Sequence, residues 1–168
     1  MSMTVVNPAT GETIKTYKEM TPEKVQDVLE KADAAYRGWR TTNFSARTEL
    51  MKRAGQVLKD GADDYAELMA REMGKPVKDG RAEANKCAWV CDYYAENAER
   101  TLRNEMIETD ASRSFVTFQP IGVVLAVMPW TFPFWQVIRF AAPALMAGNA
   151  GVLKHASNVP GSALAIEE

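Results

Sequence analysis

Two short stretches hold most of the residues whose types could do chemistry. Residues 128–136 gather Pro, Trp, Thr and Phe at the end of the apolar run that starts at Gly122, and residues 154–157 follow a second, shorter apolar run. If both runs are parallel strands, the two stretches lie at one carboxyl edge, where open α/β sheets bind their ligands. Lys154 could contact ribose hydroxyls or phosphate, and Ser157 could donate a hydrogen bond or cap the next helix. An aromatic packing loop and an ordinary strand-to-helix loop are the competing interpretations.

Arg139 is the charged residue of an otherwise apolar helical pattern. It stands between Ile138 and Phe140, so its guanidinium must find a partner or extend to water. A bidentate clamp for a substrate carboxylate is the functional interpretation, and a salt bridge or a surface arginine is the alternative. His155, the only histidine, has no serine and aspartate pattern around it and is expected to be structural.

The cysteines and the overall charge exclude several classes of site and partner. Cys87 and Cys91 are four residues apart in a helical pattern, which seldom permits a disulfide, so we expect reduced thiols that pack the helix in a cytoplasmic protein. With a single histidine, we expect no metal site. The formal net charge is −2 and no apolar run is long enough to span a bilayer, so we expect neither a nucleic-acid nor a membrane partner.

The elements that must position these residues fall into three zones along the chain. A turn at residues 7–12 predicts a small hairpin, and four helices follow it. The first helix is capped by Thr21, the second begins at Ser45, the third ends at Gly74, and the fourth runs from about Lys78 to Leu102. In the second helix we expect one buried apolar face, formed by Leu50, Ala54, Val57 and Leu58.

The remaining third of the chain shows two patterns, a hairpin followed by alternating strands and helices. Residues 103–120 read as a projecting hairpin, with strands at 104–108 and 114–118. Beyond it, the run from Gly122 predicts a parallel strand buried on both faces, followed by a helix, a second strand and a helix capped by Ser157 or Asn158. This order is the opening of a doubly wound α/β sheet. Two strands do not complete such a sheet, so the chain is either the front of a larger domain or a natural small α/β protein.

Six motifs together resemble the aldehyde dehydrogenase superfamily. They resemble, in order, the family's N-P-A-T-G, E-x-G-K-P, P-x-G-V, P-W-N-F-P, P-A-L-x-x-G-N and cofactor-lysine motifs, and they lie at residues 7–11, 71–76, 120–124, 129–133, 143–149 and 152–154. Among subfamilies, the chain looks most like succinate-semialdehyde dehydrogenases. The resemblance implies the N-terminal part of a Rossmann-like NAD(P)-binding domain, with helices packed on an incomplete parallel sheet. It assigns residues 1–102 and 121–168 to that partial domain and residues 103–120 to an oligomerisation hairpin.

The same resemblance implies residue roles. A cofactor, NAD or NADP, would be bound by Met128, Pro129, Trp130, Thr131, Lys154 and Ser157. Lys154 would contact the adenosine ribose, and Ser157 stands where NAD-preferring members often carry a glutamate, so NADP should be tolerated. Arg139 would anchor the carboxylate of a small aldehyde substrate. The protein is expected to form a homo-oligomer.

Two departures from the family pattern matter for activity. Thr131 replaces the asparagine whose amide donates to the oxyanion, and a hydroxyl is shorter and has only one proton to give. The family's nucleophilic cysteine and general-base glutamate match no residue of the chain, since Cys87 and Cys91 lie in the fourth helix. We therefore expect residues 1–168 alone to be inactive. The alternative is a non-catalytic remnant that acts as an assembly or interaction module.

Overall fold

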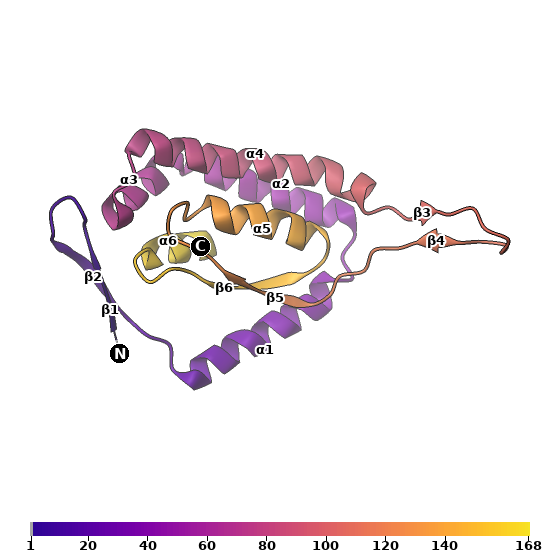
Figure 1. Ribbon diagram of the computed structural model, residues 1–168, viewed down its shortest axis with the longest axis horizontal. Helices are drawn as coiled ribbons and strands as arrows, with labels where there is room; N and C mark the ends of the chain where they lie inside the picture. Colours follow the sequence, from indigo (N-terminus) through magenta and orange to yellow (C-terminus); the bar gives the residue numbers. More distant parts are fainter. Residues whose placement is uncertain (1) are drawn as a thin grey trace.

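Helices dominate the fold. The computed structural model describes residues 2–168, and this part of the chain contains six helices and six short strands. The helices are α1 (Pro22–Trp39), α2 (Phe44–Asp60), α3 (Ala62–Met73), α4 (Val77–Thr101), α5 (Trp135–Met146) and α6 (Pro160–Glu167). The strands are β1 (Ser2–Val6), β2 (Thr13–Lys18), β3 (Glu105–Met106), β4 (Phe115–Val116), β5 (Val123–Val127) and β6 (Ala150–Lys154). Figure 1 shows their arrangement.

The centre of the fold is a β–α–β unit. Strands β5 and β6 are parallel, in a register that runs from Val123 opposite Ala150 to Val127 opposite Lys154, and α5 connects them. Helix α5 lies on one side of this pair and α1 on the other (Figure 1). The predicted order of strand, helix, strand and helix is confirmed. The prediction that the first strand is buried on both faces is wrong: Leu125 and Val127 are each 64% exposed, because α1 packs mainly against β6.

The core lies between α5 and the layer formed by α2, α3 and α4. Its fully buried side chains include Met69, Cys87, Phe134 and Met146. Helices α3 and α4 approach closely at Gly80, where a Cβ atom would stand 2.9 Å from the Cα atom of Ala66. Such an approach requires a residue without a side chain.

The buried face of α2 differs from the predicted one. The structure buries Arg47, Met51, Gly55 and Leu58, whereas Leu50, Ala54 and Val57 are exposed. The reason is the contact with α4: at Gly55 a Cβ atom would stand 3.2 Å from the carbonyl oxygen of Ala88, so the helices are too close for larger side chains there. The helix also begins one residue before the predicted Ser45, since the Asn43 side chain accepts a hydrogen bond from the Ala46 N–H.

Arg47 joins the ends of two helices. Its Nη1 donates to the carbonyl of Met146, at the end of α5, and its Nη2 donates to the carbonyls of Trp39 and Arg40, at the end of α1. Its Nε donates to the Thr42 hydroxyl. Arginine is suited to this task because its planar fork offers five N–H donors. Burial lowers the pKa of the guanidinium from its ordinary value.

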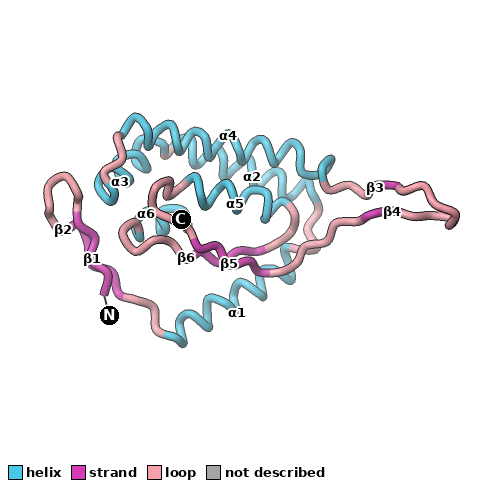
Figure 2. The backbone as a smooth tube through the Cα atoms, in the orientation of Figure 1, coloured by secondary structure: helices cyan, strands magenta, loops and turns pink. Residues whose placement is uncertain are grey.

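Two antiparallel hairpins extend from opposite ends of the body (Figure 2). The predicted N-terminal hairpin is confirmed as β1 and β2. The predicted projecting hairpin is also confirmed, although β3 and β4 span only two residues each, fewer than the five expected. A two-residue ladder offers few hydrogen bonds, and Met106, Phe115 and Val116 are exposed on it.

Candidate functional site

Residues 128–136 and residues 154–157 follow the carboxyl ends of β5 and β6, where they lie together. Val127 is opposite Lys154 in the sheet, and the N–H of Met128 donates to the Lys154 carbonyl over 3.0 Å. Residues 128–131 and 154–157 therefore leave the sheet side by side, as the sequence predicts. Lys154, Ser157 and Thr131 are exposed at this edge.

The loop after β5 has an exposed half and a buried half. Trp130, Thr131 and Phe132 are exposed, whereas Pro133 and Phe134 are fully buried. The Phe134 ring packs against Tyr65 of α3, with 4.8 Å between the ring centroids. The loop thus presents Thr131 to solvent from a fixed base, and its second half packs into the core as the aromatic packing interpretation predicts.

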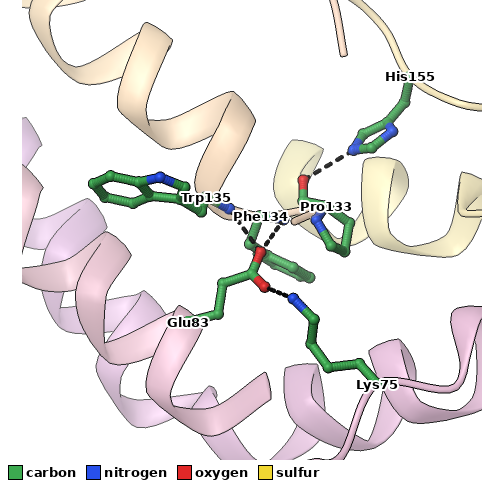
Figure 3. A network of polar contacts seen from close by, with 6 residues as sticks. All are labelled: Lys75, Glu83, Pro133, Phe134, Trp135 and His155. Carbon is green, nitrogen blue, oxygen red and sulfur yellow. Dashed lines mark hydrogen bonds and ion pairs between the residues drawn. The ribbon is translucent and has the colours of Figure 1, made fainter. Parts of the chain in front are cut away.

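A buried carboxylate from α4 fixes that base. Oε1 of Glu83 accepts hydrogen bonds from the N–H groups of Phe134 and Trp135, both over 2.9 Å, and Oε2 forms an ion pair with Lys75 (Figure 3). Glu83 thereby caps the N-terminus of α5, where backbone N–H groups lack partners within the helix. Lys75 also stands over the ring of Phe132, 4.0 Å from its centroid.

His155 holds the same loop from the opposite side. The N–H of Ala156 donates to Nδ1 of His155, so that nitrogen carries no proton, and Nε2 donates to the Pro133 carbonyl over 2.9 Å. Both ring nitrogens are therefore occupied within the protein, and Figure 3 shows the contact with Pro133. This arrangement confirms that His155 is structural.

The N-terminus of α6 is capped by another buried acid. Glu72 of α3 accepts hydrogen bonds from the N–H groups of Gly161 and Ser162 and from the Ser162 hydroxyl, over 2.6, 2.8 and 2.8 Å. The prediction that Ser157 or Asn158 caps α6 is wrong, because α6 has no side-chain cap from its own flanking residues. Glu72 and Glu83 were not among the predicted site residues. The signal that could have found them is a glutamate on the inner face of an amphipathic helix, where a charge needs a buried partner.

A pocket of about 700 Å³ lies beside the loop, between α4 and α5. Phe132, Trp135, Gln136 and Arg139 line one wall, and Lys75, Glu83 and Lys86 line the other. The Lys86 ammonium stands 4.1 Å from the centroid of the Trp135 ring, and Arg139 Nη2 donates to Gln136 Oε1 over 3.3 Å. The charged lining consists of the cations Arg139, Lys75 and Lys86 and the anions Asp79 and Glu83, and Lys75 is paired with Glu83. Thr131, Lys154 and Ser157 do not line it.

The two cysteines pack inside the helical layer. Cys87 and Cys91 are buried and form no disulfide, which confirms their expected packing role. Burial raises the pKa of the Cys87 thiol and raises that of Cys91 to about 11. Both thiols are therefore protonated at neutral pH and poor nucleophiles.

Two features are absent from residues 2–168. No cluster of three or more metal-ligating side chains lies in this part of the chain. No helix within it is both long enough and apolar enough to cross a bilayer.

Fold and site together define a β–α–β unit with polar residues at its carboxyl edge, and comparison with known proteins makes the class specific. The chain belongs to the aldehyde dehydrogenase family, whose family model matches residues 1–168. It is 51% identical over its whole length to a Synechocystis protein named as a probable NADP(+) succinate-semialdehyde dehydrogenase, and it covers 37% of that protein. It is 49% identical to the Mycobacterium leprae succinate-semialdehyde dehydrogenase for NADP(+), with 98% of the chain and 36% of the relative covered.

A solved structure agrees with these relatives. The succinic semialdehyde dehydrogenase of Streptococcus pyogenes, solved with NADP+, superposes with a TM-score of 0.94 at 37% identity, covering 98% of the chain and 36% of that protein. The chain thus spans little more than a third of the length of the relatives it matches. The expected fold, the N-terminal part of an aldehyde dehydrogenase, is confirmed.

Proposed function

We propose that this chain forms the part of an NADP+-dependent succinate-semialdehyde dehydrogenase that receives the adenosine end of the cofactor and the carboxylate end of the aldehyde. The observation that carries the proposal is the shared edge of β5 and β6. At this edge Met128 lies next to Lys154, and a pocket lined by Arg139 lies beside the loop that follows β5. The names of the relatives support the same substrate and cofactor.

The residues at this edge fit an NADP dinucleotide. The exposed ammonium of Lys154 can contact ribose hydroxyls or a 2′-phosphate, and Ser157 brings no carboxylate that would repel the phosphate. NADP+ supplies the acceptor for a hydride from the aldehyde carbon. The backbone of residues 128–131 would line the nicotinamide side, and the Thr131 hydroxyl would donate toward the oxyanion that forms when a nucleophile adds to the aldehyde.

Arg139 supplies the substrate selectivity in this proposal. It stands in the pocket wall with its guanidinium bonded only to the neutral Gln136 side chain among the contacts in residues 2–168. Succinate semialdehyde carries a carboxylate at the end remote from its aldehyde, so an arginine can distinguish it from a neutral aldehyde of similar length. A hydrogen bond to a charged group contributes about 1.5–3 kcal/mol, which corresponds to a factor of about 10–100 in kcat/KM.

The experiment compares two aldehydes in the full-length protein that contains this chain. With Arg139→Met, kcat/KM for succinate semialdehyde is expected to fall by about 10–100-fold, while kcat/KM for butanal changes by less than about threefold. Arg139→Lys, which keeps the charge but loses the fork, should lie between. An equal loss for both aldehydes would show that Arg139 does not read the carboxylate.

Under the same proposal, residues 1–168 have no activity on their own. The hairpin at 103–120 has a role in assembly. Met106, Phe115 and Val116 expose apolar surface on a ribbon that needs a partner surface to be stable. Phe115→Asp should lower the oligomeric state measured by light scattering, whereas Ala111→Asp at the turn should not. If the full-length protein associates but forms no NADPH with any aldehyde, the non-catalytic assembly module is the better description.

A further inference from the structure

Glu83 makes three polar contacts, two with the backbone at the start of α5 and one with Lys75. Its Oε1 binds the N–H groups of Phe134 and Trp135, and its Oε2 pairs with Lys75. The side chain is buried, and a buried carboxylate is costly unless such partners are present. In Figure 3 the carboxylate reaches from α4 to the start of α5 and to Lys75.

Through its ion pair with Lys75, Glu83 also contacts the part of the loop next to Thr131. Lys75 lies against the ring of Phe132, the residue that follows Thr131. On the opposite side, His155 binds the carbonyl of Pro133. Every residue from 132 to 135 is thus bound by a side chain from another part of the chain, and Thr131 is the first residue before this clamped segment.

We infer that Glu83 is a positioning residue, which fixes the loop so that residue 131 points at the aldehyde oxygen. The inference rests on the proposed function, because the oxyanion donor at 131 is part of it. Without the carboxylate, the first N–H groups of α5 lose their partner and the loop can shift. A misplacement of about 1 Å in an active site can cost about 100-fold in rate.

The chain offers a matched control in Glu72. It is equally buried, and it caps α6 in the way that Glu83 caps α5, but the loop that contains Thr131 leads into α5 and not into α6. Glu72→Gln therefore reports what the loss of a buried acidic helix cap does in general. Glu83→Gln reports what it does at this loop.

The kinetic test uses the full-length protein that contains this chain. Glu83→Gln is expected to lower kcat by at least about 10-fold with little change in KM for NADP+, and Glu72→Gln to lower it by less than about threefold. Glu83→Asp, which keeps the charge but retracts the carboxylate, should behave like Glu83→Gln. Any gain in kcat from Thr131→Asn should disappear in the Glu83→Gln background, because the two positions act through one loop. Equal losses in the Glu72 and Glu83 variants, or an undiminished Thr131→Asn gain, would overturn the inference.

A second readout does not depend on activity. Amide hydrogen exchange at residues 134 and 135 should accelerate by at least about 10-fold in Glu83→Gln and remain unchanged in Glu72→Gln, which should instead affect residues 161 and 162. If the unsubstituted protein oxidises no aldehyde, the proposed function fails, and exchange alone decides whether Glu83 fixes the loop. Unchanged exchange at 134 and 135 overturns the inference whatever the activity.

Discussion

Replacing Arg47 by methionine removes a cation that joins the ends of α1 and α5. The side chain is only 6% exposed and donates to three backbone carbonyls and one hydroxyl. These contacts are not of equal weight. The Trp39 carbonyl keeps the N–H and the hydroxyl of Thr42 as partners, and Arg40 lies at the surface. The carbonyl of Met146, a fully buried residue at the end of α5, is the group that is left without its donor.

The expected loss of stability therefore depends mainly on the Met146 carbonyl. A buried carbonyl without a partner costs about 1–3 kcal/mol, and the loss of a charge-assisted hydrogen bond adds a contribution of similar size. We therefore expect Arg47→Met to lower the free energy of unfolding by about 3 kcal/mol. For a cooperative unit of about 150–250 residues, that corresponds to a fall in the melting temperature of about 6–12 °C, and for the longer full-length protein the fall is smaller. Arg47→Lys keeps the charge but not the fork, so about half of this loss is expected.

The assay is thermal unfolding of the full-length protein that contains this chain, with Arg53→Met as the control. Arg53 lies on the same helix but is exposed, so its replacement should change stability by less than about 0.5 kcal/mol. A second perturbation approaches Arg47 from the other side: at Gly148, with φ +89°, a Cβ atom would stand 2.8 Å from Arg47 Nη2. Gly148→Ala should destabilise, and less so when Arg47 is already methionine. Equal melting temperatures for Arg47→Met and Arg53→Met would refute the reasoning.

Four further outcomes are expected. Thr131→Asn should raise kcat in the full-length protein by about 10–100-fold, because an amide donor reaches the oxyanion better than a hydroxyl; steady-state NADPH formation measures it. Ser157→Glu should raise KM for NADP+ at least about 10-fold relative to KM for NAD+, because a carboxylate repels the 2′-phosphate. Cys87 and Cys91 should react with a thiol reagent at pH 8 at least about 100-fold faster in denaturant than in the folded protein. Folding raises the pKa of the Cys91 thiol from 9.0 to about 11, so above pH 9 this thiol ionises in the unfolded chain before it ionises in the folded one. The free energy of unfolding should therefore fall as the pH rises above 9. Denaturant titrations at several pH values will detect this fall.

Local patterns predicted the parts of the fold that depend on neighbouring residues. Thr21 caps α1 by accepting from the Lys24 N–H, and Gly74 ends α3 with a left-handed φ of 73°. The placement of Lys154 beside residues 128–131 followed from two apolar runs and the rule that successive parallel strands share a carboxyl edge. In each case the controlling residue lies within a few positions of the feature that it controls.

Contacts between distant residues explain what the sequence could not predict. Glu83 caps a helix 51 positions further along the chain, and Glu72 one 89 positions further, so rules based on flanking residues miss both. The buried face of α2 depends on how closely α4 approaches Gly55, which no periodicity within α2 records. Hydrophobic pattern alone favours Leu50 and Val57 over a glycine as buried residues, and the helix crossing reverses that order.

The two acidic caps also constrain how a dinucleotide can lie on this edge. Nucleotide-binding α/β folds commonly place a diphosphate at a helix N-terminus, where free N–H groups and the helix dipole attract it. Here the N-termini of α5 and α6 are already filled by Glu83 and Glu72, each of which uses two of those N–H groups and adds negative charge beside them. A diphosphate would lose both the donors and the attraction at either helix. In the proposed function, the exposed ammonium of Lys154 is then the positive group that this edge offers to a cofactor.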